Sequence, residues 1–258
     1  MSPPVFLADP GDLDALVPGD VYWLRGPEAH HASVQRLAPG DLVDIVDTVG
    51  VRLHGTVAER DEPHEAGAHE SLAVEVVRLV REPAGDPALV LVQALAKGDR
   101  DERAVEAATE VGVDRVVPWQ AHRAVVVWRG RRAAKSHAAW VSTVRAAAKQ
   151  SRRAWVPPVA DPVSLTTLTA LVASARAAGG LAVVLDADAA IPLASAPLPL
   201  AGDVVVIVGP EGGIAPAELG ALTTAGALPC RLGPHILRTS TAGPVALALL
   251  AQRLGRWT

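Results

Sequence analysis

The sequence predicts an α/β protein in which a small β-rich domain precedes a larger domain built on a parallel sheet. Two observations lead to this expectation. Apolar and polar residues alternate, between Pro-Gly pairs, in the first 80 or so of the 258 residues. From residue 88 onward, short buried apolar runs alternate with amphipathic helical patterns, which is typical of parallel strands joined by helices.

The N-terminal region has the features of short strands and turns. Residues 41–60 and 71–80 alternate in the manner of half-buried strands, and Pro-Gly pairs at 18–19 and 39–40 mark turns. We therefore expect a small β-barrel in residues 1–80. The run REPAGDP, residues 81–87, predicts a linker, and residues 88–258 form the second domain.

The second domain is expected to alternate strands with helices. The strand-like runs, each ending in a loop, are residues 88–95, 114–119, 181–188, 203–213 and 230–239. The helical runs are residues 101–112, 138–151 and 242–255. Because ligands of parallel sheets bind beyond the carboxyl ends of the strands, the Gly-rich loops that follow the later strands are the first candidates for a site.

Composition excludes several classes of site. The lone Cys230 excludes an intrachain disulfide framework, and the eight histidines show no paired metal-ligand spacing beyond the adjacent His30 and His31, so we expect no metal. The N-terminus has no signal-like core and the longest apolar runs are too short to span a bilayer. We expect a cytoplasmic protein with no membrane partner.

Charge is unevenly distributed along the chain. The formal net charge is −4, yet residues 115–160 contain no acidic residue and ten of the 24 basic ones. These ten are Arg115, Arg123, Arg129, Arg131, Arg132, Lys135, Arg145, Lys149, Arg152 and Arg153. This local excess of positive charge favours contact with a nucleic acid. The alternative is a solvated, arginine-rich helix face.

Two loops could carry chemistry, and neither is a common phosphate loop. GPEGG, residues 209–213, lacks the Lys-Ser/Thr of a P-loop and the spaced glycines of a dinucleotide fingerprint. In RTSTAG, Arg238 stands where a hydrolase elbow has its first glycine. What strengthens both loops is their pairing, since LGPHILRTSTAGP follows GPEGG by about twenty residues and leads into the closing helix.

Four motifs in order carry a resemblance. They are KGDRDERAVEAATEVGVDRVVP, AAAKQSRRAWVPPV, IVGPEGGIAPAEL and LGPHILRTSTA. With them the chain resembles the 16S ribosomal RNA uridine-N3 methyltransferases of the SPOUT class, through most of residues 91–250. HHASVQRLAPGD, residues 30–41, is more weakly similar to that family's PUA-like RNA-binding barrel.

The resemblance implies a C-terminal trefoil-knotted SPOUT domain, a homodimer that completes the site, and S-adenosylmethionine as cofactor. The substrate would be 16S rRNA of the small ribosomal subunit, methylated at N3 of a uridine. Glycines suit the loops because they let the backbone approach a ligand closely. The implied cofactor-binding residues are Leu185, Gly209, Pro210, Glu211, Gly212, Gly213, Leu232, Gly233, Ile236, Leu237, Arg238, Thr241 and Ala242.

Catalytic and RNA-binding roles follow from the same resemblance. Arg238 would orient the target base or a phosphate, with a structural pairing as the alternative. Glu211 is the candidate base, with capping of turn amides or support of the dimer as the alternative. The implied RNA-binding residues are His30, Arg36, Gln150, Arg152 and Arg153. The alternative is packing for Gln150 and Arg153, and a plain surface role for His30 and Arg36.

Two departures leave the general base open. The family commonly has glutamate where this chain has Lys149 and Ser240, so neither position can supply an indispensable proton acceptor here. Two other functions stay open as well. One is a SPOUT methyltransferase that acts on another RNA site, and the other is a non-catalytic RNA-binding or ribosome-assembly protein.

Overall fold

The computed structural model describes residues 2–59 and 71–257, which form two compact units. The first unit comprises the described residues up to Ala84 together with Ala148–Val156. The second comprises Gly85–Ala147 and the chain from Pro157 onward. In the described ranges, none of the helices combines the length and the apolar character that crossing a membrane requires.

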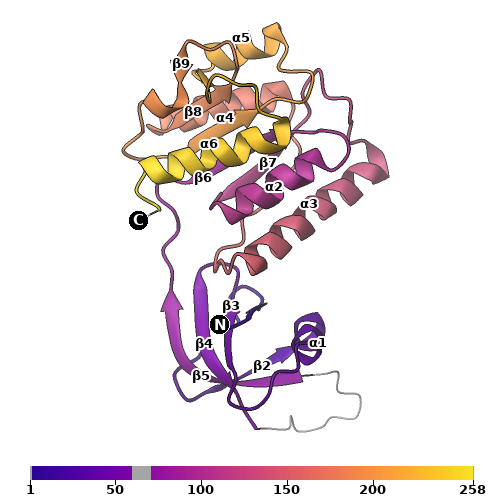
Figure 1. Ribbon diagram of the computed structural model, residues 1–258, viewed down its shortest axis with the longest axis vertical. Coiled ribbons are helices and arrows are strands. Elements are labelled where there is room, and N and C mark those ends of the chain that lie inside the picture. The colour runs from indigo at the N-terminus through magenta and orange to yellow at the C-terminus, as the bar shows by residue number, and fades with distance from the viewer. Residues whose placement is uncertain (1, 60–70, 258) are drawn as a thin grey trace. The chain divides into compact units, whose positions relative to one another are not determined.

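A five-stranded sheet forms the first unit, as the alternating pattern predicts (Figure 1). The strands are β1 (Val5–Leu7), β2 (Val21–Arg25), β3 (Leu42–Val46), β4 (Val51–Val57) and β5 (Ser71–Arg81). Their order is β1-β3-β4-β5-β2, antiparallel except that β1 pairs parallel with β3. Phe6, Ile45 and Leu53 lie in its core without exposed surface. The sequence pattern did not predict α1 (Gly26–Val34), a short helix that begins at a Gly-Pro pair.

The segment 148–156 is held to this sheet by backbone contacts. The amide of Gly50 donates to the carbonyl of Ala154 at 3.3 Å, and the amide of Val156 donates to that of Thr48 at 3.0 Å. Gly50 has φ +105°, and a Cβ placed there would lie 2.6 Å from the Trp155 ring. Only glycine therefore fits at this point. The linear sequence hides this pairing, because about a hundred residues separate the partners.

Buried charges reinforce the same contact. The Arg52 guanidinium pairs with Asp44 at 3.2 Å and Glu82 at 2.6 Å, and donates to the carbonyl of Arg152 at 2.7 Å. His54 adds a contact to Asp44 at 2.8 Å. Because every charged group in this cluster faces an opposite charge or a hydrogen-bond acceptor, the backbone of residue 152 is fixed to the first unit.

Lys149 is expected to stabilise the first unit. Its Nζ lies 2.6 Å from Glu28 Oε2 and over the Phe6 ring at 5.1 Å, and both charged side chains are mostly buried. Lys149→Glu would place two carboxylates together and should lower the free energy of unfolding by about 2 kcal/mol, between the values for exposed and buried pairs. Adding Glu28→Gln should recover much of the loss, because glutamine still accepts from the Leu7 amide. Urea unfolding of the full chain measures both, and unchanged stability of Lys149→Glu would refute the claim.

The second unit is built on a six-stranded sheet in which every pair is parallel, which confirms the predicted α/β class. Its strands are β6 (Leu89–Ala94), β7 (Arg115–Trp119), β8 (Leu181–Leu185), β9 (Ile191–Pro192), β10 (Val204–Val208) and β11 (Leu228–Arg231). Their order is β7-β6-β10-β8-β11-β9. The helices are α2 (Arg100–Glu110), α4 (Leu165–Ala177), α5 (Pro216–Thr224), α6 (Thr239–Arg253) and α3 (Gly130–Gln150), whose last three residues belong to the first unit.

Side chains of the central strands point alternately to the two faces of this sheet. Val205 and Ile207 of β10 pack in one cluster with Leu168 of α4 and Leu222 of α5. On the other face, Gly243 of α6 approaches residues of β6 and β10 so closely that a Cβ there would lie 3.0 Å from Leu91. Figure 1 shows α6 across this face with α2 beside it. With helices on both faces, the carboxyl ends of β8, β10 and β11 remain open to a ligand.

Candidate functional site

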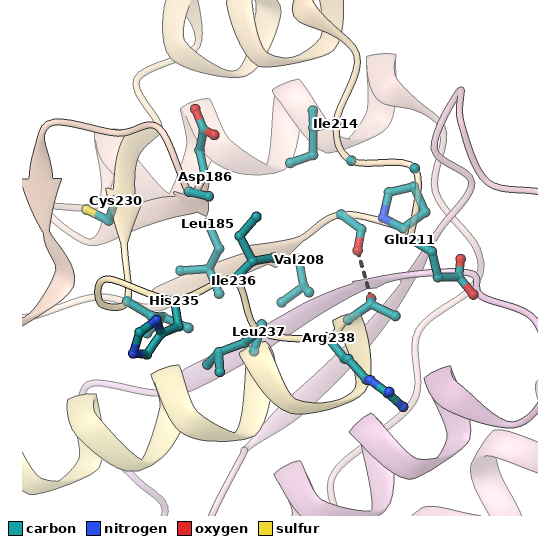
Figure 2. A pocket seen from close by; sticks show the side chains of 18 of the residues that line it. Leu185, Asp186, Val208, Glu211, Ile214, Cys230, His235, Ile236, Leu237 and Arg238 are labelled. Carbon is teal, nitrogen blue, oxygen red and sulfur yellow. Dashed lines mark hydrogen bonds between the residues drawn. The ribbon is translucent and has the colours of Figure 1, made fainter.

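A cavity of about 700 Å³ lies at the carboxyl ends of β8, β10 and β11. Three segments line it: residues 185–187 after β8, the glycine loop (residues 209–213) after β10, and the arginine loop (residues 232–238) between β11 and α6. Figure 2 shows side chains of all three turned around the same space. The loops selected from the sequence are therefore the walls of one cavity.

The predicted cofactor residues converge on this cavity with one exception. All of them line it except Thr241, which is exposed on α6. Successive helical residues are rotated by about 100°, so Thr239 and Ala242 share the inward face of α6 while Thr241 points elsewhere. The rotation of α6 decides which of its residues reach the site.

Nine further lining residues are not among the implied cofactor-binding residues. They are Arg100, Asp186, Ala187, Val208, Ile214, Leu219, Cys230, His235 and Thr239. Arg100 could have been found from the KGDRDER motif, because a motif that recurs with the loops can share their site. Cys230 is buried, and burial raises the pKa of its thiol, so it lines the wall in neutral form.

Large aliphatic side chains leave apolar surface at the cavity. Ile236 is 86% exposed and Leu237 is 36% exposed, both in the arginine loop. Leu185 and Val208 line the cavity from the ends of β8 and β10. Exposed aliphatic groups that border a hollow mark a ligand site more often than a random surface position. The lining suits a flat apolar group held between side chains.

The glycines that line the cavity differ in whether the structure requires glycine at their positions. A Cβ at Gly209 would lie 2.6 Å from Ile214, so internal packing requires glycine there. At Gly212 a Cβ would press on Arg123 at 3.3 Å, and Gly213 has φ +73°. Gly233 differs, because a Cβ there meets nothing within 4 Å. Gly233 is therefore the position where an added side chain would project into free space beside the cavity.

Glu211 ties the glycine loop to the start of α2. Its Oε1 accepts from the Lys97 amide at 3.2 Å and from the Arg100 guanidinium at 2.9 Å. Partial burial alone would raise the pKa of Glu211, but its own amide, the Lys97 amide and Arg100 together outweigh burial and lower the pKa. An ionised carboxylate held by two donors is suited to fixing the loop and is a weakened proton acceptor.

Arg238 ends the arginine loop as the N-cap of α6. Its side chain is exposed, and within residues 2–59 and 71–257 it makes no hydrogen bond or ion pair that would occupy the guanidinium. The structural pairing that the sequence left open is thus absent from the described chain. The guanidinium is free to meet a carboxylate, a phosphate or a base edge.

The predicted RNA-binding residues all belong to the first unit. His30 lies on α1 and Arg36 just after it, while Gln150, Arg152 and Arg153 lie in the segment 148–156. Arg153 is half-buried and the other four are exposed. The fold therefore gathers on one compact unit residues that are more than a hundred positions apart in sequence.

The basic interval itself does not form a single free surface. Arg115 pairs with Asp203 at 3.1 Å, Lys149 pairs with Glu28, and Arg123 donates to the carbonyl of Gly212 at 3.2 Å. These three serve intramolecular contacts. Four others are exposed on α3, namely Arg131, Arg132, Lys135 and Arg145. Of the original charge argument, the α3 face, Arg129 and Arg152 remain as exposed cationic groups.

A metal site finds no support in the described ranges, where no three His, Cys, Asp or Glu residues are grouped to hold an ion. Two of the eight histidines, His64 and His69, lie outside the described residues.

Comparison with known proteins decides the family. A model described as an RNA methyltransferase domain matches residues 84–251. The chain belongs to this RNA methyltransferase family. "Ribosomal RNA small subunit methyltransferase E" of Mycobacterium bovis is 43% identical over 240 residues, or 93% of this chain and 89% of that protein. The protein of that name from Bacillus subtilis is 29% identical over 236 residues, or 88% of each chain.

Solved structures extend the family likeness to both units. The small subunit methyltransferase E of Neisseria gonorrhoeae, a structure bound to S-adenosyl methionine, superposes with a TM-score of 0.81 at 26% identity and covers 98% of either chain. A Legionella pneumophila protein matches in fold, with a TM-score of 0.78 at 24% identity over 98% of each chain. The motif-based resemblance to this methyltransferase family is confirmed.

Proposed function

We propose that the protein transfers a methyl group from S-adenosylmethionine to N3 of a uridine in the 16S rRNA of the small ribosomal subunit. The observation that carries the proposal is the convergence of the glycine loop and the arginine loop on one cavity at the carboxyl ends of β8, β10 and β11. The relatives named as small subunit methyltransferases support the RNA substrate, and the relative bound to S-adenosyl methionine supports the cofactor.

The cavity lining fits the proposed cofactor. Adenine is flat and largely apolar, which suits the exposed side chains of Ile236 and Leu237. Gly233 leaves room for a close approach to the backbone. Asp186 and Glu211 bring carboxylates that can offset the positive sulfonium. S-adenosylmethionine supplies an activated methyl group, so the lining needs to bind and orient and does not need to activate the donor.

Further features belong to the same proposal. The parallel sheet forms a trefoil knot, two copies of the chain form a homodimer that completes the site, and the first unit closes as a PUA-like RNA-binding barrel. The protein works in the cytoplasm, where rRNA is modified. The proposed domain limits are 1–80 and 88–258, with a linker at 81–87. The segment 148–156 packs with the first unit and serves RNA binding.

Proposed roles within the site follow from the contacts. Arg238 orients the target base through its unoccupied guanidinium, and catalysis rests chiefly on placing that base against the methyl donor. Glu211 tethers the glycine loop to Lys97 and Arg100. The cavity lining also carries Asp186 and His235, which with Glu211 are its groups able to accept the N3 proton.

Replacing Glu211 separates tethering from proton transfer. Glu211→Gln keeps one carbonyl oxygen for the Lys97 amide, so kcat should fall by less than about tenfold, whereas loss of a general base costs about 10²–10⁴-fold. Because the pKa of Glu211 is lowered, its carboxylate stays ionised until the pH falls below the usual glutamate range, and the tether should weaken only there. The measurement is kcat against pH for both proteins. A loss of a thousandfold at neutral pH would make Glu211 the base.

The basic side chains of residues 152 and 153 are expected to contact phosphates. Arg152→Ala with Arg153→Ala leaves the backbone contact of Arg152 to Arg52 in place. Each lost phosphate contact on single-stranded RNA should reduce the salt slope of log affinity by about 0.7, so the pair should reduce it by up to about 1.4. RNA affinity is measured across a salt series.

The matched control for this pair is Arg81→Ala with Arg103→Ala. It removes the same charge from two exposed surface pairs, with Asp14 and Asp99. The control should keep the wild-type slope. An equal slope in all three proteins would show that residues 152 and 153 do not meet phosphates.

Purified protein tests the proposed reaction directly. It is incubated with methyl-labelled S-adenosylmethionine and, in separate reactions, small subunits, free 16S rRNA, large-subunit rRNA and transfer RNA. The RNA is then digested to nucleosides. N3-methyluridine from small subunits or 16S rRNA is expected. Label in another RNA or another nucleoside would replace the proposed target, and cofactor binding without any transfer would favour an assembly protein.

A further inference from the structure

A chain of buried hydrogen bonds connects the central sheet to both loops of the cavity. Thr239 Oγ1 donates to the carbonyl of Gly209 at 2.7 Å, the bond drawn as a dashed line in Figure 2. Gln93 Nε2 of β6 donates to the same Thr239 hydroxyl at 2.9 Å and to the carbonyl of Ala94 at 3.1 Å. Gln93 has no exposed surface, and Thr239 is 7% exposed.

Chemistry fixes the direction of this chain. A hydroxyl has one hydrogen, so when Thr239 donates to Gly209 it must accept from Gln93. Gly209 opens the glycine loop, and Thr239 directly follows Arg238 at the end of the arginine loop. Within the described ranges, no other hydrogen bond joins residues 209–213 to residues 232–239. The spacing between the two loops thus depends on this one bond and on apolar packing.

This chain of hydrogen bonds carries a free-energy cost that a purely structural contact would not need. Gln93 occupies a position on an otherwise apolar strand, and its Oε1 is buried without a hydrogen-bond partner. An unpaired buried carbonyl destabilises the fold, and an aliphatic side chain of similar size would avoid that cost. In a low-dielectric interior the bonds that Gln93 does make are strong and directional. What they secure is the relative placement of the cavity walls.

We propose that Gln93 and Thr239 are positioning residues of the methyl-transfer site. They hold the carbonyl end of the glycine loop at a fixed distance from the turn that carries Arg238, so that the cavity has its binding shape before the cofactor enters. The inference rests on the proposed function for the identity of that cofactor. It adds two residues outside the implied cofactor-binding set, of which Gln93 is fully buried and acts through Thr239.

The test replaces Thr239 by valine, which has nearly the same shape but can neither donate nor accept. The KM for S-adenosylmethionine should rise about tenfold, because the loops lose their fixed spacing. Thr239→Ser keeps the hydroxyl and should return KM to within about twofold of the wild type. Thr109→Val is the matched control, since it removes another fully buried threonine hydroxyl, one that donates to the carbonyl of Val105 within α2.

Two readouts separate positioning from simple stabilisation. Both valine variants are expected to lower the midpoint of thermal unfolding, and only Thr239→Val should raise KM. Wild-type KM in a destabilised Thr239→Val protein would overturn the inference. Gln93→Met provides a second variant should Thr239→Val not fold. This variant keeps the hydrogen bond from Thr239 to Gly209 but removes the Gln93 amide that donates to the Thr239 hydroxyl. We expect it to raise the KM for S-adenosylmethionine about threefold. An unchanged KM would again overturn the proposal. A wild-type chain that does not bind S-adenosylmethionine at all would refute the proposed function instead.

Discussion

Gly233→Val should reduce the affinity for S-adenosylmethionine about 100-fold while the free protein keeps its thermal stability. A Cβ at this position meets nothing within 4 Å, so the ligand-free fold has room for valine. Gly233 nevertheless lines the cavity, and the added methyl groups would take space that the cofactor needs. Overpacking costs about 1–3 kcal/mol, and a 100-fold loss corresponds to about 2.7 kcal/mol.

Calorimetric titration of S-adenosylmethionine measures this effect. The matched control is Gly220→Val, which adds the same atoms at an exposed position of α5 that also has no neighbour within 4 Å of a Cβ. The control should bind like the wild type. If the Gly233→Val protein bound S-adenosylmethionine as tightly as the wild type, the cofactor would not occupy this cavity. Gly212 is a poorer test, because a side chain there would also displace Arg123.

Arg238→Ala is expected to lower kcat about 100-fold and to change the affinity for S-adenosylmethionine only a few-fold. The guanidinium is exposed at the cavity and unoccupied within the described chain, so its removal leaves no buried group unsatisfied. Loss of a group that orients a reactant costs about a hundredfold when the base is no longer held in line. Arg238→Lys should restore little, because an ammonium lacks the planar fork of donors.

Single-turnover methylation at saturating cofactor measures the rate, and calorimetry measures the affinity. Arg103→Ala serves as control, since it removes an arginine whose contact is a surface pair with Asp99. If the Arg238→Ala protein lost cofactor affinity in proportion to its rate, Arg238 would be a cofactor ligand. Wild-type rates would remove it from the reaction.

The glycine loop illustrates what could be predicted from sequence. Val204–Val208 is a fully buried run that ends at Gly209, and its short length and β-branched residues favour a central strand that delivers its loop to the sheet edge. The arginine loop could be placed in the same way, since it leads into an apolar helix. Local patterns therefore located both loops that form walls of the cavity.

Contacts between distant residues could not be predicted. Gln93 and Thr239 are 146 positions apart, and nothing near either residue indicates the other. The attachment of segment 148–156 to the first unit depends on backbone groups of Thr48 and Gly50, which leave no side-chain signature. Thr241 is separated from the cavity on a much smaller scale, because helical rotation turns it away from the face that Thr239 and Ala242 present to the cavity.

Mapping of modified nucleosides tests the central claim most directly. Small-subunit rRNA from a strain that lacks the gene is compared with rRNA from the same strain carrying either the wild-type protein or the Gly233→Val protein. Our account predicts that one N3-methyluridine disappears from 16S rRNA on deletion, returns with the wild type and stays absent with Gly233→Val. An unchanged set of 16S modifications, or a methyl group lost from another RNA, would contradict it.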